Sequence, residues 1–201
     1  MKLKYFIQSD LGRYVQTYEL RGQAYSKWKV LFESFLFKAG FQAVFLYRVS
    51  HWFFQHGWTY LAWLAARINL TLTGAEIEFN AKIGPGLFIA HPVGIVIGRG
   101  VVIGSQATLF QGATLAVKNW HPGEIARFPK VGNSCFIFAH AVILGGISVG
   151  DYCVVAANAV VTKDLPEGSL ARGVPAEIYP NEGKSAILSW LGQEQKTEVK
   201  N

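Results

Sequence analysis

An aliphatic residue returns at every sixth position of the chain from Ile77 onward. These anchors are interrupted by a two-residue insertion and by a longer segment at 116–130, and they are Ile77, Ile83, Ile89, Ile97, Ile103, Leu109, Leu115, Val131, Ile137, Ile143, Val149, Val155 and Val161. A small residue often follows four places later, as at Ala81, Ala107, Ala113, Cys135, Ala141, Cys153 and Ala159. A six-residue period fits neither an α-helix nor a series of hairpins. It is typical of a parallel β-helix in which three hexads form one coil. The pattern therefore predicts a mainly β domain.

The first seventy residues follow a different pattern. Apolar positions at helical spacing predict helices over residues 28–39, 41–54 and 59–69, with breaks at Gly40 and Gly57. The change of pattern near residues 70–74 divides the chain into an N-terminal helical region (1–73), a β-helix domain (74–182) and a C-terminal tail (183–201). Residues 187–191 of the tail are a candidate capping helix.

Charge and aromatic residues sharpen the contrast between the two regions. Residues 1–70 hold nine Lys and Arg against three Asp and Glu, which accounts for the whole net charge of +6, and eighteen of the twenty-eight aromatic residues. Such an aromatic chain is not disordered. Because no nucleic-acid motif accompanies the charge, no nucleic-acid partner is expected. Two interpretations stay open: the helices cover the β-helix end or contact another subunit, or they lie on an anionic membrane.

The N-terminal segment and the two cysteines predict the cellular compartment of the protein. Met1–Asp10 has no apolar run followed by a small-residue cleavage site, and polar residues interrupt the apolar stretch Phe41–Leu70. We therefore expect a cytoplasmic protein, peripheral at the inner face of the cell membrane if the front region binds lipid. Cys135 and Cys153 are eighteen residues apart, one predicted coil. We expect them to stack on adjacent coils as buried thiols rather than as a disulfide.

Three segments carry a resemblance to a known family. They are GFQAVFLYRVSHW at 40–52, AEIEFNAKIGPGLFIAHPVGIVIG at 75–98 and ARGVPAEIYP at 171–180. Together with the hexads, they resemble the serine acetyltransferases and their relatives among the left-handed β-helix acyltransferases, over residues 39–180. The resemblance implies a left-handed parallel β-helix, a homotrimer, and transfer of an acetyl group from the co-substrate acetyl-CoA to a hydroxyl acceptor.

The candidate catalytic residues are His91 and Glu76. O-acetyl transfer needs a base for the acceptor proton and a group that orients this base. His91 lies beside the two-residue insertion, where a side chain leaves the flat wall, and an imidazole exchanges protons near neutral pH. The resemblance aligns His91 with the family's catalytic histidine and Glu76 with an aspartate paired to it. The alternatives are a solvated turn histidine and a surface glutamate.

The interruption at 116–130 predicts a loop that leaves the coil wall. Trp120 and His121 offer an aromatic platform and a polar group suited to a sugar ring, or they anchor the loop on a neighbouring subunit. Arg127 matches the family's carboxylate-binding arginine, and Phe128 follows it. These four residues form the predicted acceptor-binding set.

The resemblance implies that CoA is bound largely through backbone groups along the coils. The candidate positions are Ala139, Gly145, Ala157, Gly173 and Pro175, with His140 facing the groove or solvent, and with Lys163 and Arg172 as phosphate partners. No metal site is predicted.

Two departures from the family pattern favour an acceptor other than serine. Ala90 stands where serine acetyltransferases commonly have an aspartate that holds the serine amine, and Phe128 stands where they have a histidine. We therefore predict an enzyme that acetylates a sugar hydroxyl in the synthesis of a capsule, exopolysaccharide or lipopolysaccharide. The alternatives are a serine O-acetyltransferase of cysteine biosynthesis and, from another class, a non-catalytic β-helix scaffold. A metal hydratase is disfavoured because His91, His121 and His140 are irregularly spaced.

Overall fold

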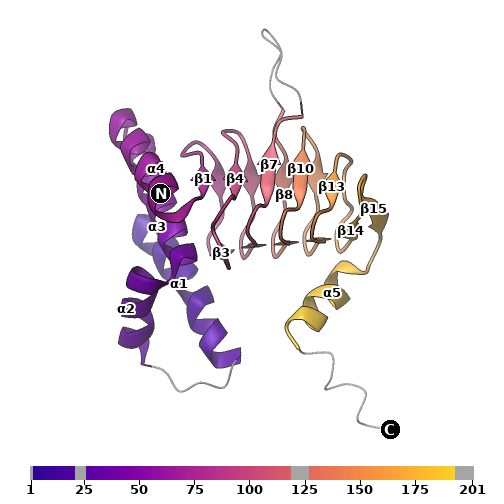
Figure 1. The fold of residues 1–201 in the computed structure, drawn as a ribbon, viewed down its shortest axis with the longest axis horizontal. Coiled ribbons are helices and arrows are strands. Elements are labelled where there is room, and N and C mark those ends of the chain that lie inside the picture. The colour runs from indigo at the N-terminus through magenta and orange to yellow at the C-terminus, as the bar shows by residue number, and fades with distance from the viewer. Residues whose placement is uncertain (1, 21–25, 119–126, 193–201) are drawn as a thin grey trace.

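The computed structural model describes residues 2–20, 26–118 and 127–192. Helices cover one end of a β-helix, and a short helix lies near its other end (Figure 1). The strands are short, and their bounds are β1 Glu76–Ile77, β2 Lys82–Ile83, β3 Phe88–Ile89, β4 Val96–Ile97, β5 Val102–Ile103, β6 Thr108–Leu109, β7 Thr114–Ala116, β8 Lys130–Val131, β9 Phe136–Ile137, β10 Val142–Leu144, β11 Ser148–Val149, β12 Val154–Val155, β13 Val160–Val161, β14 Leu170–Arg172 and β15 Glu177–Tyr179.

Consecutive strands belong to different sheets, so the chain winds around three faces. Sheet A has the order β1-β4-β7-β10-β13, sheet B the order β11-β8-β5-β2, and sheet C the order β15-β14-β12-β9-β6-β3. Neighbouring strands are parallel, except that β15 pairs antiparallel with β14. The anchors of successive coils lie in register, as Ile77 with Ile97 and Leu109 with Ile137. The predicted left-handed β-helix is confirmed.

Two corners of the triangular coils are important for the site. The CA corner comprises the turns that lead from sheet C to sheet A (90–95, 110–113, 138–141 and 156–159) and their continuation at 173–176. The AB corner comprises the turns that lead from sheet A to sheet B (78–81, 98–101, 117–118 with 127–129, 145–147 and 162–164). Sheet A separates the two corners.

The core follows from the hexad pattern. Every anchor residue is at most 5% exposed, and every small residue four places later is at most 1% exposed. An aliphatic side chain fills the inside of each flat side, and a small side chain allows the tight corner that follows. Each coil buries its apolar face against the next.

The helices are α1 Leu3–Leu20, α2 Lys27–Phe37, α3 Ala39–Gln55, α4 Thr59–Thr73 and α5 Gly183–Trp190. The break predicted at Gly40 lies two residues earlier, at Lys38, so Gly40 is inside α3. It allows close packing instead: a Cβ atom there would collide with the carbonyl oxygen of Ile89. Helix α1 was not predicted. Ala43, Val44 and Tyr47 of α3 belong to the same hydrophobic cluster as the coils. The boundary near residue 73 therefore marks a change of secondary structure within one core.

A buried ion pair fastens the helices to the first coil. Arg48 and Asp10 have side chains that are 0% and 1% exposed, and Arg48 Nε lies 2.8 Å from Asp10 Oδ2. The guanidinium also donates to the carbonyl oxygens of Ile83 and Gly84, both at 2.6 Å. Asp10 Oδ1 accepts the backbone N–H groups of Gly86 and Leu87. Both charges are therefore compensated inside the protein.

The C-terminal end is closed by β15 and α5. Trp190 of α5 packs edge-on against Phe110, Phe136 and Phe138, which project from the sheet C side of the coils. Helix α5 therefore packs against the aromatic side chains of sheet C, and β15 ends that sheet.

Cys135 and Cys153 are free and buried, as predicted. Their thiols donate to the carbonyl oxygens of Gly150 and Pro166. Burial raises the pKa of the Cys135 thiol to about 12, so this thiol is protonated at neutral pH and is not a nucleophile.

Candidate active site

His91 lies on the widest turn of the CA corner, between β3 and β4, and its side chain is exposed. The turn is held from both sides. Gly94 N–H donates to the carbonyl oxygen of Gly74, the residue that ends α4, and Gly112 N–H donates to Val93 on the next coil. The insertion therefore forms a fixed platform that presents an imidazole outside the coil wall, which suits a general base.

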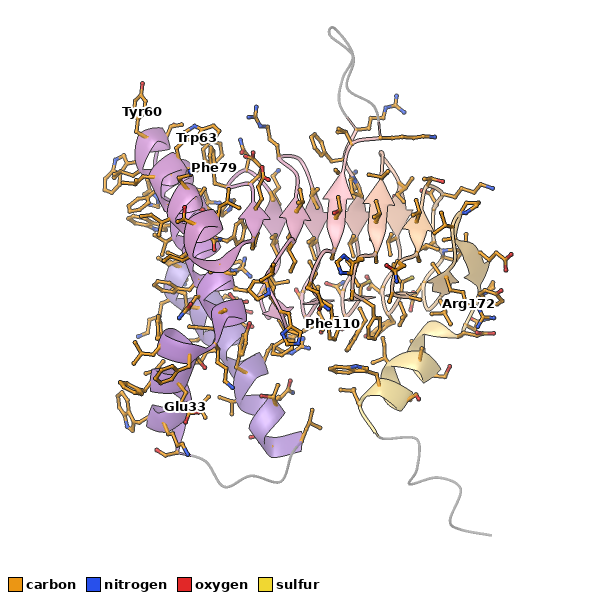
Figure 2. The ribbon with its side chains drawn as sticks, viewed as in Figure 1. Glu33, Tyr60, Trp63, Phe79, Phe110 and Arg172 are labelled. Carbon is orange, nitrogen blue, oxygen red and sulfur yellow. The ribbon has the colours of Figure 1, made fainter. Side chains whose placement is uncertain are left out.

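Glu76 lies on β1, and its side chain is exposed on the outer side of sheet A. It lines a cleft of about 130 Å³ between α4 and the first coil, together with Trp63, Arg67 and Phe79. Trp63 and Phe79 make an edge-to-face contact in this cleft (Figure 2). Within the described residues, the salt bridges do not include Glu76 with His91. The pairing of these two residues stays a prediction.

Gln111 is a candidate that sequence reasoning missed. It lies on the coil next to His91, between the hydrogen bonds that join Ala90 N–H to Leu109 O and Gly112 N–H to Val93 O, both 3.0 Å. Its Oε1 atom is buried and has no hydrogen-bond partner within the described residues. An unpartnered buried acceptor is costly, so a bound ligand with an N–H or O–H group would satisfy it. No sequence motif distinguishes Gln111.

Arg127 lies on the AB corner, at the end of the loop that leaves β7. Its side-chain stem packs on Gly146 of the next coil, where an added Cβ atom would lie 2.5 Å from Arg127 Cβ and 3.2 Å from its Cδ. The other end of the loop is close by, since Lys118 Cβ lies over Gly145. The Gly145–Gly146 pair therefore provides the space that seats both ends of the loop. Trp120 and His121 lie outside the described residues.

Phe128 packs on its own chain. Its ring lies over Gly98 and Gly100 of the preceding coil, where a Cβ atom at either glycine would meet ring carbons. The side chain is partly buried and contacts the hydrophobic cluster. Phe128 thus anchors the loop to the coil. The contact of Phe128 with the acceptor is not tested by this packing and stays a prediction.

The predicted general base and the predicted carboxylate-binding arginine lie on two different corners. His91 is on the CA corner and Arg127 on the AB corner, with the width of sheet A between them. One hexad of extended chain spans roughly 15–20 Å, which is beyond the reach of an arginine side chain. A single chain therefore does not bring His91 and Arg127 together.

The predicted CoA-binding positions also divide between the corners. Ala139, His140 and Ala157 follow one another along the CA corner, where Asn158 N–H donates to Ala139 O, and Gly173 and Pro175 continue the line. From the His91 turn to Gly173, this line spans four coil spacings, about 19 Å. Gly145 and Lys163 lie on the AB corner.

At the C-terminal end, Lys163, Arg172, Gly173 and Pro175 line one cleft of about 690 Å³. Arg172 lies at this end of the β-helix, far from the helical end (Figure 2). Its guanidinium carbon lies 3.9 Å from the centroid of the Tyr179 ring, and side-chain hydrogen bonding with Tyr179 raises the pKa of Arg172. The cleft thus has two basic side chains, the chemistry that suits phosphate groups.

Comparison with known proteins identifies the family. The family model "Bacterial transferase hexapeptide (six repeats)" matches residues 128–163. The serine acetyltransferase of Helicobacter pylori strain J99 is 40% identical over 154 residues, which are 77% of this chain and 86% of that protein. The chain belongs to the serine acetyltransferase family.

Solved serine acetyltransferases have the same fold. One in complex with CoA is 33% identical, with a TM-score of 0.73 over 86% of this chain and 69% of that chain. The Neisseria gonorrhoeae serine acetyltransferase in complex with serine is 28% identical, with a TM-score of 0.76 over 89% of this chain and 69% of that chain. The predictions of an O-acetyltransferase and of acetyl-CoA as its co-substrate are confirmed.

The predicted acetylation of surface polysaccharide is wrong. The curated relatives and solved structures compared with this chain are named as serine acetyltransferases, which supports the alternative instead. The error came from treating Ala90 and Phe128 as changes in an acceptor pocket. Phe128 is accounted for by its packing on Gly98 and Gly100.

Proposed function

We propose that this protein is a serine O-acetyltransferase, which transfers the acetyl group of acetyl-CoA to the hydroxyl of serine. The observation that carries the proposal is the family membership together with an exposed His91 on a fixed turn of the CA corner. The fold alone would not identify the acceptor, because one fold supports many acceptors.

In the proposed reaction, His91 removes the proton of the serine hydroxyl while its oxygen attacks the thioester carbonyl. A carbon–oxygen bond forms, and the carbon–sulfur bond of acetyl-CoA breaks. The protonated imidazole then returns the proton to the CoA thiolate. The products are the acetyl ester of serine and free CoA, and His91 is neutral again. In this scheme Glu76 orients His91.

Serine recognition uses polar groups on both corners in this proposal. The Arg127 guanidinium binds the serine carboxylate, an interaction of opposite charges that supports two parallel hydrogen bonds. Ala90 offers no charge to the amine. Gln111 Oε1, which has no hydrogen-bond partner among the described residues and lies on the coil beside His91, accepts from the ammonium group instead.

The separation of the corners supports a homotrimer. If the CA corner of one copy faces the AB corner of its neighbour, His91 and Arg127 meet across the contact. Such a contact joins unlike surfaces, and contacts of this kind form closed rings when the rotation permits. Three triangular prisms arranged in this way make three equal sites, so we expect a mass of three chains in light scattering.

The test is release of CoA thiol from acetyl-CoA in the presence of L-serine, with D-serine, L-threonine and a free sugar as comparison acceptors. The proposal expects saturable thiol release with L-serine, and its loss in His91→Ala while CoA still binds by calorimetry. If the intact trimer binds CoA but releases no thiol with L-serine, the serine proposal fails. If it binds no acetyl-CoA at all, the non-catalytic scaffold is favoured.

A further inference from the structure

Helix α2 presents a face that nothing in the described structure covers. Trp28, Phe32 and Leu36 recur at four-residue spacing along one side and are 79%, 62% and 53% exposed. Phe37 at the helix end is 72% exposed, whereas the opposite side buries Val30 at 0%. We call Trp28, Phe32, Leu36 and Phe37 the α2 face.

The position of α2 makes this face accessible. The helix lies at the end of the molecule that carries the helical bundle. Its residue Glu33 is labelled in Figure 2, well away from the coils. Phe35 contacts Phe41 and Phe45 of α3, with ring centroids 4.9 and 5.0 Å apart. Helix α3 is itself fixed to the first coil by Arg48. The α2 face is therefore held on a rigid support.

The charge around this face is positive. Lys27, Lys29 and Lys38 lie in or beside α2, against one acid, Glu33, which pairs with Lys29 at 3.8 Å. In the first seventy residues, the opposite charges of the buried Asp10 and Arg48 side chains sum to zero. The +6 of this region is therefore carried by its other residues, while the rest of the chain is neutral.

We infer that the α2 face docks on an anionic lipid membrane. Exposed aromatic and aliphatic side chains beside lysines are the composition of a helix that lies in the membrane interface. Basic residues near such a surface add attraction to anionic lipid. A second copy of this chain fits less well, because a contact between identical faces would bring two basic regions together.

The mode of binding is peripheral. No single helix among the described residues is long and apolar enough to cross a membrane. Segment Trp28–Phe37 and α3 are long and apolar enough for a membrane span only when taken together, and the pair is bent by 84°. Helix α3 is packed on the β-helix. The proposal thus places the coils in solution with the helical end on the lipid.

The test is flotation of the full-length protein with vesicles of phosphatidylcholine alone or with 30% phosphatidylglycerol. The test variant is Trp28→Ser/Phe32→Ser/Leu36→Ser, which changes only exposed side chains. The control is Leu188→Ser in α5, which is 43% exposed and lies in the C-terminal helix. The wild type and the control are expected to float with anionic vesicles. The triple variant is expected to lose about tenfold or more in partitioning, and 0.5 M salt is expected to weaken binding.

The outcomes separate the possible occupants of this face. Binding that needs anionic lipid and the α2 face supports the inference. Absence of binding overturns it. If the triple variant also halves the mass in light scattering, the face is a contact between copies. Binding that the triple variant retains overturns the assignment to α2. Each variant's circular dichroism and acetyl-transfer rate show whether it is folded.

Discussion

The buried pair of Asp10 and Arg48 gives a sharp prediction about stability. In Asp10→Asn the shape is kept, but the charge is removed and one acceptor oxygen is replaced by an NH₂ group. The Arg48 side chain, 0% exposed, then stays inside the protein as a cation without its counterion. Removing one partner of a buried ion pair typically costs about 3–5 kcal/mol. That is a large share of the roughly 5–15 kcal/mol by which proteins are stable.

The assay is urea unfolding followed by circular dichroism. The protein concentration is fixed, because the apparent stability of an oligomer depends on it and a homotrimer is proposed. The matched control is Lys29→Gln, which breaks the exposed Lys29–Glu33 pair and should change the free energy of unfolding by less than about 1 kcal/mol. If Asp10→Asn costs no more than this control, the ion pair does not fasten the helices to the coil.

Three further predictions concern the site and its support. His91→Ala should lower turnover by about 10²–10⁴-fold with unchanged CoA affinity, measured by thiol release and calorimetry; an active variant would exclude His91 as the base. Gly146→Ala should displace the Arg127 stem and reduce kcat/KM for serine roughly ten- to hundredfold, while KM for acetyl-CoA stays constant. If KM for acetyl-CoA changes as much as kcat/KM for serine, Gly146 does not act by positioning Arg127. Burial lowers the pKa of His51, whose Nδ1 lies 2.6 Å from Phe79 O. Its contribution to stability is therefore complete above about pH 6.5 and lost as pH falls through the folded-state pKa, so His51→Gln should flatten that part of a stability–pH curve.

The β-helix was predictable because its order is local and repeated. Each hexad fixes an inward aliphatic residue and a small corner residue, so position along the chain determines position in the core. Helix α1 was harder to recognise, since much of its attachment is polar. Arg13 donates to the carbonyl oxygen of Gln106, and Tyr14 donates to that of Ile89. Such contacts leave no periodic apolar stripe.

The site was only partly predictable for a similar reason. His91 could be singled out because it lies beside the insertion that interrupts the register. Gln111 continues the repeat, and only the three-dimensional structure reveals that its Oε1 atom has no hydrogen-bond partner among the described residues. The packing of Phe128 depends on two glycines from the preceding coil. Because this contact is not evident from the sequence, Phe128 was interpreted as a residue of the acceptor pocket. That interpretation contributed to the incorrect prediction of a sugar acceptor.

The composite site is tested most directly by complementation between two inactive variants. His91→Ala and Arg127→Ala are produced separately, and also co-expressed in one cell with different tags, and serine acetylation is measured for each preparation. If each site takes His91 from one chain and Arg127 from its neighbour, a random mixture has both residues intact in about a quarter of its sites. The co-expressed preparation is therefore expected to recover about a quarter of wild-type activity. Activity no higher than that of the separate variants would contradict it.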